Sequence, residues 1–343
     1  MPFVEVCTST GLIKFHYTIS TPTCASAQTI DPELPVVLFF HAFAFHAIFH
    51  SQFSSVLLRK FNLVVFDLRW HGYTESDTIP HFYGQEQAAE DAIAFMDAIQ
   101  LPPCHFVAID IGSMIALQVA VTRPKYVRSL FIMSHICLEE IPSVAEGRTE
   151  LYNLFISGTP GAMNDVGLGY HQYAFSNRMS NLANAICAET LRINLMNWSP
   201  EHFKEYRLAS YEIFLHRKAH SQQALSRISC PVKLLYGTNS VVYTPDYNHR
   251  LYESMQQARL DVSLQAVLNA PHYLCVDHGN EVNLLIHDFI SQSIGDKDNV
   301  FIPTNIDSPW SAILREYGWY PERMNEFDDE FITVTFPTGS MSL

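Results

Sequence analysis

Short continuous apolar runs alternate along this chain with stretches of helical periodicity, and that alternation restricts the folds it can adopt. The apolar runs cover residues 36–40, 63–66, 105–109, 129–133 and 232–236. Such runs are typical of strands that are buried on both faces of a parallel sheet. Between them, residues 87–99 carry apolar side chains at spacings of three and four, which predicts an amphipathic helix. Strands that alternate with helices predict a parallel sheet with crossover helices, the α/β class.

One long segment interrupts this rhythm. Residues 136–228 are rich in helix formers and aromatic residues and contain no strand-like run. We therefore expect a helical cap, inserted after the sixth core strand. The pattern resumes at Val232, just after Pro231, a residue that suits the entry of a strand. The expected organisation is a core of residues 1–135 and 229–292, a cap of residues 136–228, and a C-terminal extension of residues 293–343.

Composition excludes several classes of protein. Hydrophobic residues make up 48% of the 343 and charged residues 16%, which indicates a globular chain. The net charge of −14 opposes binding to nucleic acid. The sequence starts without a basic leader and contains no uninterrupted apolar stretch of membrane-spanning length, so we expect a soluble, cytoplasmic protein. No residue pattern indicates a cofactor, and the chain could form a homodimer.

A polar residue lies between small residues at a predicted strand-to-helix turn. The segment Ala108-Ile109-Asp110-Ile111-Gly112 has the form of a nucleophile elbow, Gly-x-Ser-x-Gly in its common version. Small residues are needed two positions away because the turn is tight. Alternatively, Asp110 could simply cap the following helix, and Ser113 is best explained as a hydroxyl at the helix start.

Three further motifs accompany this turn in a particular order. His272 lies in a predicted loop near the end of the core, and the segments 39–44 and 66–72 follow two earlier strands. Over residues 35–292 the chain resembles the α/β-hydrolases, in which the nucleophile comes first and the histidine last. The resemblance implies Asp110 as nucleophile and His272 as base. It also implies an oxyanion hole formed by the backbone N–H groups of Phe43 and Ile111.

The chain departs from the family at several positions. Ala42 and Trp70 replace glycines, and Asp110 replaces the usual serine. The acid of the triad is missing from both of its common positions, where Ser240 and the pair Ser134 and His135 stand instead. Three acids are close in sequence to these positions but remain unassigned: Glu139, Glu140 and Asp246.

An aspartate at the elbow resembles epoxide hydrolases and haloalkane dehalogenases. In those enzymes the carboxylate attacks carbon, and histidine-activated water hydrolyses the resulting ester. A carboxylate is ionised at neutral pH and needs no base to act as a nucleophile. Those relatives often have tryptophan after the aspartate, where this chain has Ile111. Candidate residues of the substrate pocket are His41, Phe45, Tyr152, Tyr170, Tyr173, Trp198 and Tyr206.

Three functions are consistent with these residues. The first is hydrolysis of an apolar small molecule through an ester of Asp110. In the second, an Asp110–His272 dyad performs acid–base chemistry without hydrolysis, as an isomerase, lyase or cyclase of specialised metabolism. The third is a catalytically inert, ligand-binding scaffold. His41, His46 and His50 could chelate a metal, but with no carboxylate or cysteine among them the pattern favours packing, and we expect no metal.

Overall fold

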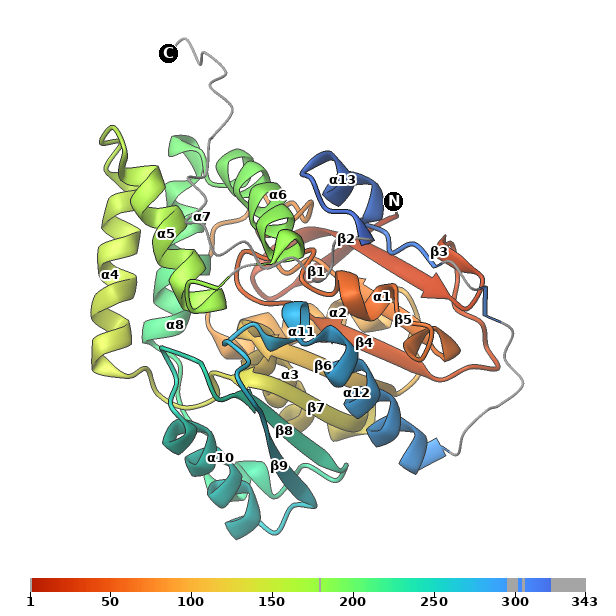
Figure 1. The fold of residues 1–343 in the computed structure, drawn as a ribbon. Coiled ribbons are helices and arrows are strands. Elements are labelled where there is room, and N and C mark those ends of the chain that lie inside the picture. The colour runs from red at the N-terminus through yellow and green to blue at the C-terminus, as the bar shows by residue number, and fades with distance from the viewer. Residues whose placement is uncertain (1, 179, 295–301, 304–305, 322–343) are drawn as a thin grey trace.

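The computed structural model describes residues 2–178, 180–294, 302–303 and 306–321 and is built on one mixed sheet (Figure 1). The strands run in the order β1-β2-β5-β4-β6-β7-β8-β9, and β3 pairs with β2. Their bounds are β1 Phe3–Thr8, β2 Gly11–Thr21, β3 Cys24–Ala27, β4 Val36–Phe40, β5 Asn62–Phe66, β6 Cys104–Asp110, β7 Val127–His135, β8 Val232–Gly237 and β9 Val262–Val267. The strands from β5 to β9 in this order are parallel, as the sequence predicts.

The antiparallel edge of the sheet is absent from the sequence prediction. Strands β1 and β3 each pair antiparallel with β2, and β2 pairs antiparallel with β5. In β2, apolar Ile13 and Phe15 alternate with Lys14 and His16. Although β2 lies between β1 and β5, it has no continuous apolar run, because an antiparallel strand commonly alternates apolar and polar side chains.

Helices cover both faces of the sheet and fill the segment between β7 and β8 (Figure 1). Those beside the sheet are α1 His50–Phe53, α2 Gln85–Ala98, α3 Ile111–Thr122, α10 Pro245–Gln257, α11 Leu274–Asp277 and α12 Gly279–Ile294, with short turns η1 Leu58–Lys60 and η2 Pro124–Tyr126. Helix α2 confirms the helix predicted at residues 87–99.

The segment between β7 and β8 is helical throughout, and we call it the cap segment. It contains α4 Pro142–Ile156, α5 Ala162–Phe175, α6 Asn181–Asn197, η3 Pro200–His202, α7 Phe203–Arg207, the π-helical turn η4 Leu208–Glu212, α8 Ile213–Leu215 and α9 Gln222–Leu225. Helices α4 to α8 gather at one side of the sheet in Figure 1, and α9 contacts α10. Whether they form a separate domain with the expected bounds stays a prediction.

The C-terminal extension packs onto the core where the structure describes it. Helix α13, Ser311–Glu316, contacts α6, and Trp310 packs edge-on against Phe53 of α1 at 5.2 Å between ring centroids. Ser308 Oγ lies 2.6 Å from His50 Nδ1. Residues 295–301, 304–305 and 322–343 of the expected extension lie outside the described residues.

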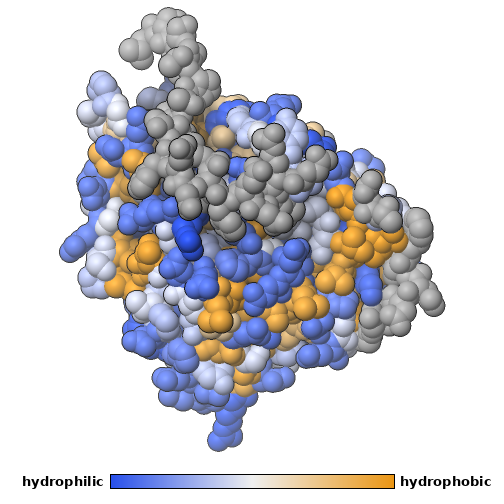
Figure 2. All heavy atoms as spheres, in the orientation of Figure 1, coloured by the Kyte–Doolittle hydropathy of each residue, from blue (hydrophilic) through white to orange (hydrophobic). Residues whose placement is uncertain are grey.

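Hydrophilic and hydrophobic residues are interspersed over the face shown in Figure 2. Of the helices that the structure describes, none combines the length and the apolar character needed to cross a membrane.

Candidate active site

Asp110 stands at a strained turn between β6 and α3. Its backbone has φ 53°, a left-handed conformation that is uncommon for a residue with a side chain. Gly112 makes the turn sterically feasible, because a Cβ there would lie 2.3 Å from the carbonyl oxygen of Phe40. The Asp110 side chain makes no capping hydrogen bond to α3, so it does not serve as the helix cap. The turn instead directs the carboxylate to other partners.

Four groups surround the Asp110 carboxylate, which is 0% exposed. Oδ2 accepts hydrogen bonds from the backbone N–H of Phe43 at 3.0 Å and from the Tyr273 hydroxyl at 3.1 Å. Oδ1 accepts one from the Tyr173 hydroxyl at 2.6 Å and lies 3.4 Å from His272 Nε2. The fold therefore brings Asp110, His272 and the Phe43 N–H together. The role of the Ile111 N–H stays a prediction.

The histidine loop is fixed by a close backbone contact. A Cβ on Gly237, at the end of β8, would lie 2.2 Å from the carbonyl oxygen of Ala270 and 2.3 Å from that of Pro271. Only glycine lets the loop approach so closely. Ser134, at the expected position for an acid, donates its hydroxyl to the His272 carbonyl at 2.5 Å. It therefore holds the backbone of the loop and does not contact the imidazole as an acid would.

Asp110 is held in its ionised form. Burial alone would raise the pKa of this carboxyl group, since it penalises the charge. The hydrogen bond and charge of His272, the charge of Arg148 and the hydrogen bond from Tyr173 outweigh burial and hold the pKa below its usual value. Asp110 is thus a buried carboxylate with compensating donors.

No second carboxylate within the described residues lies at ion-pair distance from His272. Ser240, at the other usual acid position, accepts a hydrogen bond from the Tyr243 N–H at 3.3 Å. Among the three unassigned acids, Glu139 caps the N–H of Ala219 at 3.3 Å, and Asp246 lies in the first turn of α10. The third, Glu140, is buried in an ion network.

Glu140 binds two buried arginines. Its carboxylate accepts hydrogen bonds from Arg148 Nε at 2.9 Å and from Arg217 at 2.7 and 2.8 Å. The Tyr243 hydroxyl donates to the same group at 3.0 Å. Arg148 also donates to the Tyr173 hydroxyl oxygen at 2.9 Å, and this connects the network to Asp110.

Aromatic residues surround Phe43, whose N–H reaches Asp110. The Trp198 ring stacks on it at 5.5 Å between centroids, and the Tyr170 ring lies at 5.7 Å. The hydroxyls of Tyr170 and Tyr206 are 3.0 Å apart. Three predicted pocket residues therefore lie near the site. Phe45 does as well, because its ring packs edge-on against Tyr273 at 5.2 Å.

Two other predicted pocket residues have different surroundings. Tyr152 stacks on Tyr206 and on Tyr211 of the cap segment, at 5.7 and 4.9 Å. His41 uses both ring nitrogens for the backbone: Nδ1 donates to the Ala42 carbonyl at 2.7 Å, and Nε2 accepts from the Leu68 N–H at 2.9 Å. Only the face or edge of its ring could contact a substrate.

The neighbouring histidines contact other side chains. His46 Nε2 lies 4.0 Å from Glu189 of α6, and His50 contacts Ser308 as described above. Among the described residues, no three His, Cys, Asp or Glu side chains are grouped so that they could hold a metal ion.

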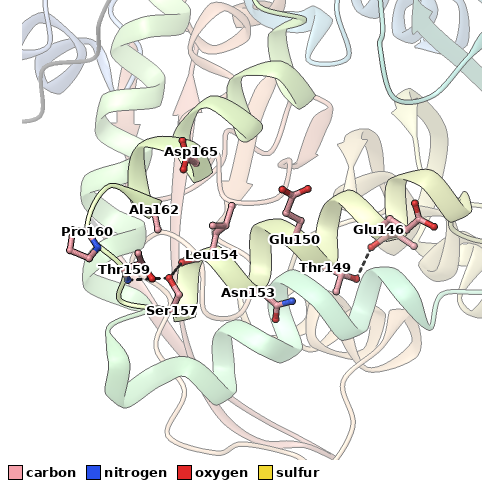
Figure 3. A pocket seen from close by; sticks show the side chains of 11 residues that line it. Glu146, Thr149, Glu150, Asn153, Leu154, Ser157, Thr159, Pro160, Ala162 and Asp165 are labelled. Carbon is pink, nitrogen blue, oxygen red and sulfur yellow. Dashed lines mark hydrogen bonds between the residues drawn. The ribbon is translucent and has the colours of Figure 1, made fainter.

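An open hollow of about 800 Å³ lies on the cap segment, away from this site. It is lined by side chains of α4, α5 and their connection, including Glu150, Leu154 and Asp165 (Figure 3). Asp110, His272 and Phe43 do not line it. Since Asp110 and His272 are 0% and 1% exposed, the site is closed in this conformation.

Sequence reasoning missed Tyr273 and Arg148. Tyr273 directly follows His272, and its aromatic character beside a predicted base was the available signal. Arg148 carried no signal, because no sequence pattern in the cap segment indicates that this arginine is buried and reaches Asp110 through Tyr173.

Comparison with known proteins agrees with this architecture. Residues 35–157 match the model of a family described as alpha/beta hydrolase fold. A search of curated proteins finds no significant match.

Solved structures resemble most of the chain at low sequence identity. An esterase from Thermogutta terrifontis has a TM-score of 0.64 and 17% identity, over 85% of this chain and 99% of that one. An enol-lactonase from Burkholderia xenovorans has a TM-score of 0.63 and 14% identity, over 84% and 100%. An epoxide hydrolase from Vigna radiata has a TM-score of 0.61 and 18% identity, over 85% and 97%. The chain is an α/β-hydrolase-fold protein, as its motifs predict.

Proposed function

We propose that this protein is a hydrolase of an apolar small molecule, such as an epoxide, and that Asp110 forms a covalent ester during the reaction. One observation carries the proposal. Asp110 Oδ2 accepts the hydrogen bond of the Phe43 N–H, while Oδ1 faces His272 Nε2 and the Tyr173 hydroxyl. An ester mechanism requires two different environments for the two oxygens. One oxygen must attack the substrate, and the other must lie beside a hydrogen-bond donor that stabilises the negative charge formed during ester hydrolysis.

In the first step Asp110 Oδ1 attacks a carbon of the epoxide. The C–O bond breaks, its electron pair moves to the epoxide oxygen, and that oxygen takes the Tyr173 hydroxyl proton. The products are a neutral ester on Asp110 and a Tyr173 phenolate. Asp110 suits this role because its lowered pKa keeps it ionised at neutral pH.

In the second step His272 removes a proton from water, and the hydroxide attacks the carbonyl carbon of the ester. The Phe43 N–H stabilises the oxyanion on Oδ2. When the intermediate collapses, the product leaves with the original Oδ1 and takes the proton from His272. The new Asp110 carboxyl group then returns a proton to the Tyr173 phenolate.

The surroundings favour an apolar substrate. The rings of Tyr170 and Trp198 pack on Phe43, the residue whose N–H binds the carboxylate, and such an aromatic surface suits an apolar ligand. Because Tyr173 occupies Oδ1 in the closed conformation, its hydroxyl must leave that oxygen before a substrate can react. Movement of α5, which carries Tyr173, would open the site.

The test is a single turnover with protein in excess over styrene oxide in water enriched in oxygen-18. The ester route places the first label on Asp110, since the product carries away an oxygen of the carboxylate. Mass spectrometry should show a 2 Da increase in the peptide that contains Asp110 and an unlabelled first product. A labelled first product with an unlabelled Asp110 would refute the ester intermediate.

A non-hydrolytic acid–base function has one observation in its favour. The described carboxylate closest to His272 is Asp110 itself, at 3.4 Å, so Asp110 could orient the imidazole and never attack carbon. With the physiological substrate, that function incorporates no solvent oxygen into product over many turnovers. The ester route incorporates one oxygen per turnover after the first.

A further inference from the structure

Arg148 fixes the direction of a hydrogen-bond chain that ends at Asp110. A guanidinium can only donate, so the Tyr173 oxygen accepts from Arg148 Nη2 at 2.9 Å. The phenol proton must then point to Asp110 Oδ1, which accepts it at 2.6 Å. Arg148 thus orients the one proton that Tyr173 can deliver.

Arg148 is itself held rigidly. Its Nε donates to Glu140 at 2.9 Å, and the guanidinium lies over the Phe214 ring at 3.6 Å from the centroid. The Arg148 and Glu140 side chains are 8% and 4% exposed. Glu140 is fixed in turn by two hydrogen bonds from Arg217. The chain therefore ends in a buried anchor that does not depend on solvent.

The charges of this cluster balance only while Asp110 is ionised. Two guanidinium groups, Arg148 and Arg217, face two carboxylates, Glu140 and Asp110. Once Asp110 is esterified, the same buried groups carry one uncompensated positive charge. An uncompensated charge in a poorly solvated interior is unfavourable, so a new negative charge beside Arg148 is favoured at that moment.

We propose that Arg148 is a positioning residue for the ester-forming step and that it stabilises the Tyr173 phenolate left after proton transfer. This inference rests on the proposed ester mechanism and extends it to a residue that does not touch the substrate. Burial and the Asp110 charge raise the pKa of Tyr173 in the resting state, which opposes loss of its proton. Esterification removes the Asp110 charge while Arg148 stays, so phenolate formation becomes favourable when the reaction requires it.

The prediction depends on whether the leaving group needs a proton. Opening of styrene oxide generates an alkoxide that Tyr173 must protonate, whereas bromide leaves benzyl bromide without a proton. Arg148→Met should slow ester formation on Asp110 by styrene oxide by about 100-fold, the usual order of a general-acid contribution. It should leave ester formation by benzyl bromide within about threefold of the parent rate, because orientation of the phenol is irrelevant there.

Matched variants separate this role from a general structural one. Arg207→Met removes an exposed arginine of the cap segment and should change neither rate. Tyr173→Phe should reproduce the split between the two electrophiles. Arg148→Lys should react with styrene oxide faster than Arg148→Met but slower than the parent. It keeps the positive charge but loses the planar guanidinium that donates to both Glu140 and Tyr173. Glu140 keeps both hydrogen bonds from Arg217 in these variants, so we expect them to fold.

Each outcome decides between the two proposals. If mass spectrometry finds no adduct on the Asp110 peptide of the parent with either electrophile, the proposed function is wrong. If the parent forms both adducts and Arg148→Met slows them equally, or slows neither, the role of Arg148 is refuted while the ester mechanism stands. If Arg148→Met does not fold, the same comparison is made in Arg148→Lys. A slower reaction with styrene oxide alone then supports the role of Arg148, and equal rates or equal slowing with the two electrophiles refute it.

Discussion

Replacement of Gly237 by alanine should displace the histidine loop and stall the proposed reaction at the ester. The new Cβ would lie 2.2 Å from the Ala270 carbonyl oxygen, whereas ordinary contacts begin at 3.4 Å. Gly237 ends a strand held between two others, so the loop must yield. It would retreat by about 1 Å, a misplacement that can cost about 100-fold in rate. His272 follows this backbone directly and would move with it.

Asp110 should be displaced much less, because β6 and α3 fix its backbone. Ester formation by styrene oxide should proceed in Gly237→Ala, while ester hydrolysis slows by about 100-fold. Rapid quenching and mass spectrometry should reveal accumulation of the Asp110 adduct. Overpacking should also reduce the free energy of unfolding by about 1 to 3 kcal/mol, measured by chemical denaturation.

The control is Gly147→Ala, which adds a methyl group in α4 that meets no atom within 4 Å apart from its chain neighbours and the backbone of its own helix. It should leave both rates unchanged. Normal hydrolysis of the ester in Gly237→Ala would show that the close contact does not position His272, and the steric reasoning would be wrong.

Three further outcomes concern stability. Gly147→Ala should raise the free energy of unfolding by about 0.5 to 1 kcal/mol, since alanine favours a helix interior over glycine; an unchanged denaturation midpoint would contradict this. Trp310→Ala should cost about 3 kcal/mol and lower the calorimetric Tm, because it empties the contact with Phe53; an unaltered Tm would mean that the C-terminal segment adds no stability. Burial lowers the pKa of His71 and of His135 to about 3, so both stay neutral in the folded protein below pH 6.5 while the unfolded chain takes up protons. Stability should therefore fall by about 1.4 kcal/mol per pH unit for each histidine as pH decreases from 6.5 toward 3, and His135→Phe should reduce that slope in denaturation curves measured at several pH values.

The parallel part of the sheet could be predicted because burial on both faces leaves a direct trace in the sequence. The segments Val36–Phe40 and Asn62–Phe66 are buried at every position, and each contains a continuous apolar run. The antiparallel strand Gly11–Thr21 alternates polar and apolar residues over its first half, and it was missed. Patterns thus report most clearly on strands whose surroundings are uniform.

The candidate site divides in a similar way. Asp110 and Gly112 belong to one local turn, whose steric demands act over a few residues and are visible in the sequence. The absence of an acid at Ser240 was visible too. Of the partners of Asp110, the family resemblance implied His272 and the Phe43 N–H, which lie 162 and 67 residues away, and Tyr173 was a pocket candidate. Tyr273, 163 residues away, was missed because no local pattern connects it to Asp110.

Sequence alone determined the alternation of strands and helices and the turn at Asp110, since each depends on neighbours along the chain, and it also gave the order of Asp110 and His272. Only the tertiary structure decided that Glu140 pairs with arginines instead of His272 and that Arg148 reaches Asp110 through Tyr173. It also decided that the site is closed. The physical reason is that pairing of buried charges depends on which side chains meet when distant segments pack, and that choice leaves no periodic pattern in the sequence.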